Sequence, residues 1–171
     1  MNIFYLDRCP KKAARMMYNK HVVKMILESA QLLCTAHREL GNDDVPYKST
    51  HKNHPSAVWT RSNALHYAWV YDHMLELGEE YERRYGRTHL TILKCEEALM
   101  DLPPEIRRNK PFAQPPQCMP DQYKADCSIK AYWNYYIGAK HSIATSTDKL
   151  LALRKKDIPG FEGTWDRLNN L

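Results

Sequence analysis

The chain has 171 residues, 43% of them hydrophobic and 26% charged, which are ordinary proportions for one globular domain and exclude wholesale disorder. Its formal net charge of +5 permits a polyanionic partner without requiring one, because net charge governs association and solubility. The five cysteines form no C-x-x-C pair and are odd in number, which argues against a disulfide framework and a structural zinc site. No stretch approaches the roughly 20 apolar residues that a membrane helix needs, so we expect no membrane association.

The first third of the chain predicts an extended start followed by helices. Residues 1–6 form a short apolar run that we expect to be extended or a first turn. Pro10 then suits the first turn of a helix over 11–17. The strongest pattern lies over 19–39, where apolar residues recur at three- and four-residue steps and predict a long helix. Gly41 follows as the expected stop.

The middle of the chain predicts two further helices. Pro55 stands at the start of a long helical pattern over 56–85, and Gly86 marks its end. Thr88 is placed to cap another helix that runs to position 100.

Residues 101–125 contain six prolines and predict a long extended connection, which in a compact domain is usually functional or wraps the surface. Ser128 can cap a last helix over 128–140. We therefore predict a mainly α fold, a compact single-domain helical bundle over 1–148 with a proline-rich connection. Residues 149–171 would form a C-terminal appendage packed on this domain or extending from it.

The first candidate site is a polar stripe on the helix over 19–39. His21, Lys24 and Glu28 fall within about a quarter turn of one another on a helix. A carboxylate beside a lysine and a histidine can act as a general acid or base, or stabilise a developing cation. The alternative is a solvated face with a Lys-Glu pair at i,i+4, and spacing alone favours this alternative.

The second candidate site surrounds the start of the helix at Pro55. Free amide groups at a helix N-terminus can hold a phosphate, and Lys52 and Arg61 stand nearby in the sequence. His51 and His54 could instead bind a metal, although no Asp, Glu or Cys completes a recognisable ligand set. A third interpretation is that the histidines cap the helix or pack against it.

The third candidate site is the aromatic run Tyr132, Trp133, Tyr135 and Tyr136, followed by Lys140. Four aromatics in five positions cover more than one helix face. Aromatic and basic residues together suit stacking on bases and contact with phosphates. An amphipathic helix packed on both sides is an equally good explanation. No P-loop, G-x-G-x-x-G, H-E-x-x-H or G-x-S-x-G motif is present.

Three segments together resemble one known family. His21 lies in the run 20–23, and Glu28 follows it seven residues later. His54-Pro55 opens the next long helix. The proline-marked segment 102–107 and the aromatic segment 133–140 follow. In this layout the chain resembles the pyrimidine-dimer DNA glycosylase/AP-lyase family known from phages, over most of positions 1–140.

The resemblance implies a terminal α-amine that attacks C1′ of a nucleotide, expels the base and forms an imine, assisted by a glutamate. An α-amine suits this step because its pKa of about 8 leaves part of it unprotonated near neutrality. Carried onto this chain, the catalytic residues are Glu28, Met1 and Asn2 at the terminus, and His21 as their neighbour. Asn2 is a poor substrate for methionine removal, which leaves Met1 as the candidate nucleophile.

The implied partner is duplex DNA with a damaged or modified pyrimidine. Leu27 and Gln31 stand where the family has arginines, so lysines of the same helix would replace them. We expect a cytoplasmic monomer of a bacterium or a phage-infected cell, without cofactor or metal. The predicted DNA contacts are Lys20, Lys24, Lys52, His54, Arg61, Trp133, Tyr135, Tyr136 and Lys140.

Other functions stay open. The same fold could carry a transferase-like enzyme that modifies a base of hypermodified phage DNA. It could be a non-catalytic module that binds nucleic acid or protein, with Glu28 merely solvated. A metal-dependent nuclease that uses His51 and His54 is the last alternative.

Overall fold

A computed structural model describes residues 1–145 and 148 of the chain. The helices of this part are α1 (Pro10–Arg15), α2 (Asn19–Glu39), α3 (Pro55–Arg61), α4 (Ala64–Tyr85), α5 (Leu90–Cys95) and α6 (Ser128–Lys140), with the short 3-10 helices η1 (Asp121–Tyr123) and η2 (His141–Ile143). No strand occurs in this part, which confirms the mainly α prediction. The predicted appendage over 149–171 lies outside the described residues. None of the helices described is long and apolar enough to cross a membrane.

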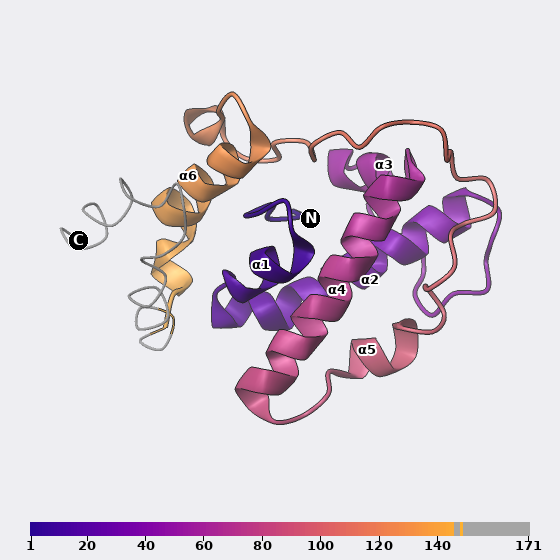
Figure 1. The fold of residues 1–171 in the computed structure, drawn as a ribbon, viewed down its shortest axis with the longest axis horizontal. Coiled ribbons are helices and arrows are strands. Elements are labelled where there is room, and N and C mark those ends of the chain that lie inside the picture. The colour runs from indigo at the N-terminus through magenta and orange to yellow at the C-terminus, as the bar shows by residue number, and fades with distance from the viewer. Residues whose placement is uncertain (146–147, 149–171) are drawn as a thin grey trace.

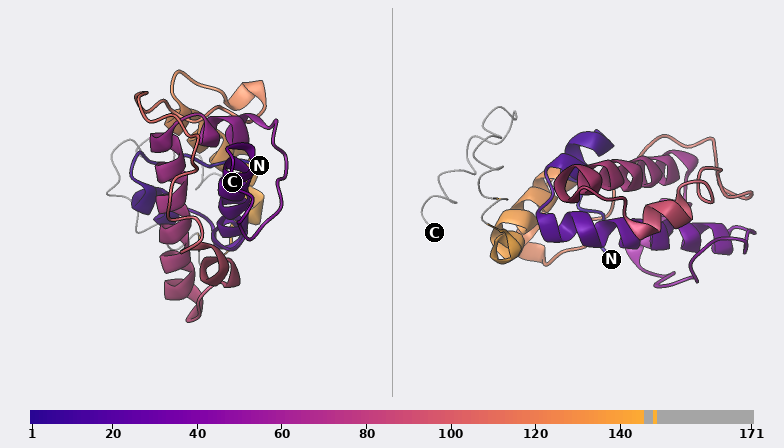
Figure 2. Two further views of the ribbon diagram at one scale, coloured as in Figure 1. Left: turned by 90° about the vertical axis from the view of Figure 1, so that its right-hand side faces the viewer. Right: turned by 90° about the horizontal axis from the view of Figure 1, so that it is seen from below.

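Helices α2 and α4 form the centre of the molecule and run antiparallel, side by side (Figures 1 and 2). At one end, the Arg84 guanidinium donates to the Asn19 side chain at 2.9 Å. At the other end, the buried His37 Nε2 lies 2.8 Å from the Tyr67 hydroxyl. The apolar face of α2 that the sequence predicted is buried against α4, and α2 has the bounds that its periodicity predicted.

The prediction of one continuous helix over 56–85 is wrong, because the chain breaks between α3 and α4. Asn63 has an extended backbone and its side chain accepts a hydrogen bond from the Leu65 amide, so it caps α4. Its Nδ2 donates to the carbonyls of Lys110 and Pro111, both at 2.9 Å. Asparagine favours such capping geometry over a helix interior, and here a distant segment supplies further partners.

Other helix boundaries also differ from prediction, and α1 begins and ends earlier than the helix predicted over 11–17. The helix predicted over 88–100 is only α5, which begins after His89, whose imidazole accepts from the Thr91 amide. Ser128 is not the cap of α6 but its first residue, and its hydroxyl donates to the carbonyl of Pro115 at 2.6 Å. His89 therefore caps α5 in place of Thr88, and the Ser128 hydroxyl bonds to the proline-rich connection instead of capping α6.

The N-terminal segment is extended and lies in the core, between α6 and α3 in Figure 1. All four side chains over positions 3–6 are buried. Phe4 has a positive φ of 51°, and the Leu6 amide donates to the Phe4 carbonyl at 2.8 Å, so the segment turns tightly here. The Trp133 indole donates to the Leu6 carbonyl at 2.9 Å. The segment is therefore fixed upstream of α1, and its first two residues reach the start of α3.

The proline-rich connection leaves α5, arches over the ends of α3 and α4, and leads to α6 (Figure 1). Its peptide groups bond to side chains of the helices. The Trp59 indole donates to the Ala113 carbonyl at 3.0 Å, and the Ala113 amide donates to His66 Nε2 at 2.9 Å. The Tyr132 hydroxyl donates to the Pro116 carbonyl at 2.8 Å. The predicted long connection thus has a defined path on the surface.

Candidate active site

The first residue of the chain lies against the first turn of α3. The Ser56 hydroxyl donates to the Met1 carbonyl at 3.3 Å and lies 3.5 Å from the sulfur of Cys118. Ser56 itself is fully buried. Asn2 Oδ1 is buried and has no hydrogen-bond partner among the described residues. The terminus is therefore held by α3 and the proline-rich connection, with an unused acceptor beside it.

His54 links the terminus to Glu28. It caps α3, and its Nδ1 accepts from the Ser56 amide at 3.2 Å, so the neutral ring carries its proton on Nε2. Burial lowers the pKa of His54, the Met1 ammonium and His51 lower it further, and the Glu28 carboxylate raises it. Such charge effects act chiefly over a few ångströms. The terminal ammonium and the Glu28 carboxylate therefore both act electrostatically on the histidine that caps α3.

Glu28 is half-buried in this site. Its side chain is 16% exposed, and Oε1 lies 3.0 Å from the ammonium of Lys24, whose own side chain is 68% exposed. This is the i,i+4 pair that the solvated-face alternative predicted. Because the lysine of this pair is exposed to solvent, the ion pair contributes little stability.

His21 packs against the N-terminal segment. It is 7% exposed, its ring stacks on Phe4 with centroids 4.4 Å apart, and its Nδ1 lies 2.7 Å from the Tyr136 hydroxyl. Burial, with smaller contributions from the Lys140 and Lys24 charges, lowers the pKa of His21 to about 4. His21 is thus neutral near pH 7 and positions Phe4, rather than facing an open pocket.

The aromatic residues of α6 pack into the protein. Tyr136 is fully buried, and its hydroxyl accepts from the Tyr18 amide at 3.0 Å, so no ring face is left to stack on a base. Tyr135 is half-buried with the Lys140 ammonium 4.9 Å from its ring centroid. Trp133 is half-buried and bonded to the N-terminal segment. The alternative of a helix packed on both sides describes α6, and for Tyr136 it replaces the stacking prediction.

The predicted phosphate contacts lie on α2 and around α3. Lys20 and Lys24 are exposed near the start of α2, and Lys52 is exposed 3.7 Å from a carboxylate oxygen of Glu39. Arg61 is half-buried and donates to the Lys52 carbonyl at 2.6 Å. Within residues 1–145 and 148, no three His, Cys, Asp or Glu side chains gather where they could hold a metal ion.

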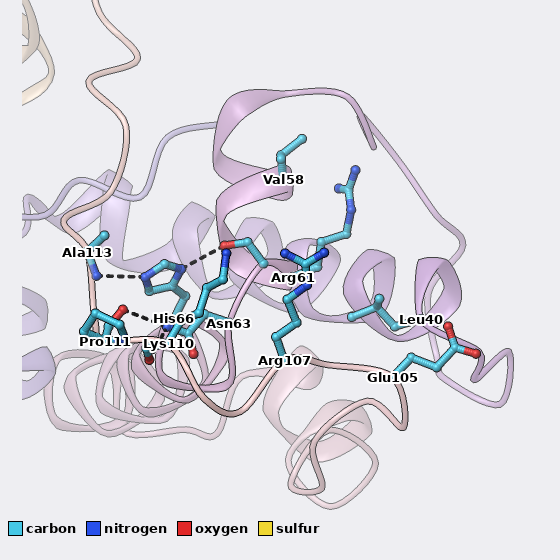
Figure 3. A pocket seen from close by; sticks show the side chains of 11 residues that line it. Leu40, Val58, Arg61, Asn63, His66, Glu105, Arg107, Lys110, Pro111 and Ala113 are labelled. Atoms are coloured by element: carbon cyan, nitrogen blue, oxygen red, sulfur yellow. Dashed lines mark hydrogen bonds between the residues drawn. The ribbon is translucent and has the colours of Figure 1, made fainter.

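A cleft of about 510 Å³ opens beside α3, at its junction with α4 (Figure 3). Arg61 lines it together with Arg107 and Lys110 from the proline-rich connection. Sequence reasoning singled out neither of the last two residues, nor Ser56 and Cys118 beside the terminus. Their local sequence carries no signal, because each acquires its neighbours only when distant segments meet.

The family model for pyrimidine dimer DNA glycosylases matches residues 1–93, which is more than half of the chain. The chain therefore belongs to the pyrimidine dimer DNA glycosylase family, a class of helical proteins that act on DNA. The matched part includes Met1, His21, Glu28, His54 and Arg61, whereas α6 and the connection that lines the cleft lie beyond it. No curated protein and no solved structure matches the chain.

Proposed function

We propose that this protein is a DNA N-glycosylase with AP-lyase activity, which acts on damaged or modified pyrimidines through attack of the Met1 α-amine on C1′. Family membership supports the class of reaction. The observation that carries the assignment of residues is the contact of Met1 with Ser56 in the first turn of α3, which His54 caps. The charges of Met1 and Glu28 both act on this histidine, which supports the assignment. A nucleophilic amine beside a half-buried carboxylate is the pair that this chemistry needs.

The proposed reaction begins with the unprotonated amine. Its nitrogen bonds to C1′, the bond from C1′ to the base breaks, and the base leaves with the electron pair and takes up a proton. The amine then loses a proton and the C1′–O4′ bond opens, which leaves an imine at C1′ and a hydroxyl at C4′. Removal of a C2′ proton breaks the C3′–O bond, expels the 3′ phosphate and cleaves the strand.

Glu28 serves these steps as a charge and as a base. Its carboxylate stabilises the positive charge that develops at C1′ and on the attacking nitrogen, and it accepts the protons that nitrogen and C2′ lose. Asn2 Oδ1, which is buried without a partner among residues 1–145 and 148, can accept a hydrogen bond from the new ammonium or from a substrate hydroxyl. The Nε2–H of His54 can donate to the departing base or to a phosphate.

DNA contacts complete the proposal. Lys20, Lys24 and Lys52 are exposed on both sides of the site and suit the phosphates of the lesion strand. Extrusion of a base costs a few kcal/mol, and damaged or modified bases cost least, so they are the favoured substrates.

Borohydride trapping tests the proposal. The purified protein is incubated with duplexes that carry a thymine dimer, an abasic site or no lesion, and the imine is reduced to a stable adduct. The same protein is prepared with an N-terminal extension and with the extension removed so that Met1 is first. We expect an adduct with both lesion duplexes only when the Met1 amine is free, and mass spectrometry of peptides should locate the adduct on residue 1.

Two results would overturn the assignment. An adduct that persists on the extended protein would move the nucleophile to a lysine, of which Lys24 is the nearest to Glu28. Tight binding of lesion DNA without adduct, abasic product or strand cleavage would favour a base-modifying enzyme or a non-catalytic binding module.

A further inference from the structure

The cleft beside α3 combines positive charge at its rim with an apolar floor. Arg61, Arg107 and Lys110 are the cations that line it, and Leu40, Val58 and Pro111 give it apolar surface. Figure 3 shows Arg61 of α3 and Arg107 of the connection among the side chains that line the cleft. The cleft therefore presents an amphipathic surface that two distant parts of the chain build jointly.

These charges have little compensation within the cleft. Arg61 is bonded to the Lys52 carbonyl, whereas no hydrogen bond or ion pair engages the side chains of Arg107 and Lys110 in the described part of the chain. Glu105 is the one carboxylate among the lining residues, and Figure 3 shows it turned away from both guanidiniums. The Glu105 carboxylate lies over Gly41 instead. A Cβ placed on Gly41 would lie 3.4 Å from Oε1 of Glu105. Like charges held together without a counterion favour an anionic ligand.

The backbone that carries these cations is fixed before any ligand binds. The Ala64 amide donates to the Arg107 carbonyl at 2.8 Å, and Asn63 Nδ2 donates to the carbonyls of Lys110 and Pro111. Both anchors belong to the start of α4, which is the longest helix described. A site on a rigid helix loses little entropy when it binds its ligand.

We propose that this cleft binds the sugar-phosphate backbone of the substrate DNA, with a phosphate on Arg107, Arg61 and Lys110 and a deoxyribose against the apolar floor. The inference rests on the proposed function, since it assumes that DNA occupies the site at Met1. Ser56, which contacts Met1, precedes Arg61 by five residues of α3, so about 8 Å of helix separates the two. That length corresponds to about two base-pair steps, so the cleft contacts the strand beside the lesion rather than at it.

Salt-dependent DNA binding tests the cleft. Affinities of the wild type, Arg107→Gln, Lys110→Gln and the double variant are measured on undamaged and abasic duplexes between 50 and 200 mM salt. Removal of one phosphate contact should make the slope of log binding constant against log salt concentration less steep by about 0.9. If wild type and variant bind equally near 1 M salt, this change in slope corresponds to about 15-fold weaker binding of the variant at 50 mM. Arg108→Gln is the matched control, because it removes the same charge from the same exposed segment outside the cleft.

We expect the cleft variants to lose affinity on both duplexes with reduced slopes, and Arg108→Gln to stay near wild type. Unchanged slopes in the double variant, or an equal effect of Arg108→Gln, would overturn the cleft proposal. These results are separate from a failure of the proposed function, which would appear as the absence of a trapped adduct with the wild-type protein.

Discussion

The hydroxyl of Tyr136 joins three parts of the structure, and its removal in Tyr136→Phe should cost about 2–4 kcal/mol of the free energy of unfolding. The hydroxyl accepts from the Tyr18 amide at 3.0 Å and lies 2.7 Å from Nδ1 of His21. Because His21 is neutral near pH 7, Nδ1 can accept the hydroxyl proton. The variant leaves the buried Nδ1 of His21 without its donor, which costs about 1–3 kcal/mol, and the partly buried Tyr18 amide without its acceptor, which costs about 1 kcal/mol.

Urea unfolding and thermal melts measure this loss. For a chain of this size, a loss of 2–4 kcal/mol lowers Tm by roughly 5–15 °C. Tyr135→Phe is the matched control, because it removes the same atom from the next residue, whose hydroxyl makes no hydrogen bond in the described part of the chain. We expect Tyr135→Phe to stay within about 0.5 kcal/mol of wild type.

A double-mutant cycle of Tyr136→Phe with His21→Leu isolates the pairing itself, with an expected coupling of about 1–2 kcal/mol. Equal losses in Tyr136→Phe and Tyr135→Phe would refute the reasoning. So would a coupling energy near zero, because the hydroxyl would then not be paired with His21.

Three further predictions concern catalysis, a buried histidine and pH. Glu28→Gln should slow base release about 10²–10⁴-fold in single-turnover assays with little change in Tm. The control Glu79→Gln, on the exposed surface of α4, should not change the rate. Equal rates in the two variants would remove Glu28 from the mechanism. His73→Leu should raise the free energy of unfolding by about 1–3 kcal/mol in urea, since both ring nitrogens are buried without a hydrogen-bond partner in the described part of the chain, and a loss would contradict this. In thermal melts, stability should fall by up to about 3 kcal/mol more in the wild type than in His21→Leu as pH drops from about 6.5 to about 4, because burial keeps His21 neutral in the fold while the unfolded chain takes up the proton. His73, whose pKa burial lowers to about 3, adds to the loss in both proteins. A flat profile over this range, or an equally steep one in His21→Leu, would exclude this cause.

Local periodicity predicted the fold where one helix face is buried without interruption. The bounds of α2 follow from its own sequence, because its apolar residues repeat at helical spacing and Gly41 adopts a positive φ just after its end. The break before α4 was missed because the helical pattern continues across it. What fixes the break is tertiary, since Asn63 is bonded to carbonyls 47 and 48 residues away.

The candidate site was predictable in its residue types and not in its geometry. Glu28 and His54 stand out in the sequence by spacing and by position at a helix start. The position of Met1 beside α3 depends on a contact between Ser56 and a residue 55 positions earlier, for which no local pattern exists. The aromatic run of α6 gave equal support to stacking and to burial, because composition alone does not tell which face of a helix is covered.

The packing of α6 bears on catalysis through the segment that carries the amine. Phe4 holds a positive φ that costs about 1–3 kcal/mol for a residue other than glycine, and its burial against His21 offsets this cost. Trp133 fixes the next bend of the segment at Leu6. In the proposed reaction, the amine therefore attacks C1′ from a position set by α6 and α2, although neither helix needs to touch the base. For this reason Tyr136→Phe should slow imine formation more than it weakens DNA binding, because it loosens the support beneath Phe4 and leaves the phosphate contacts intact.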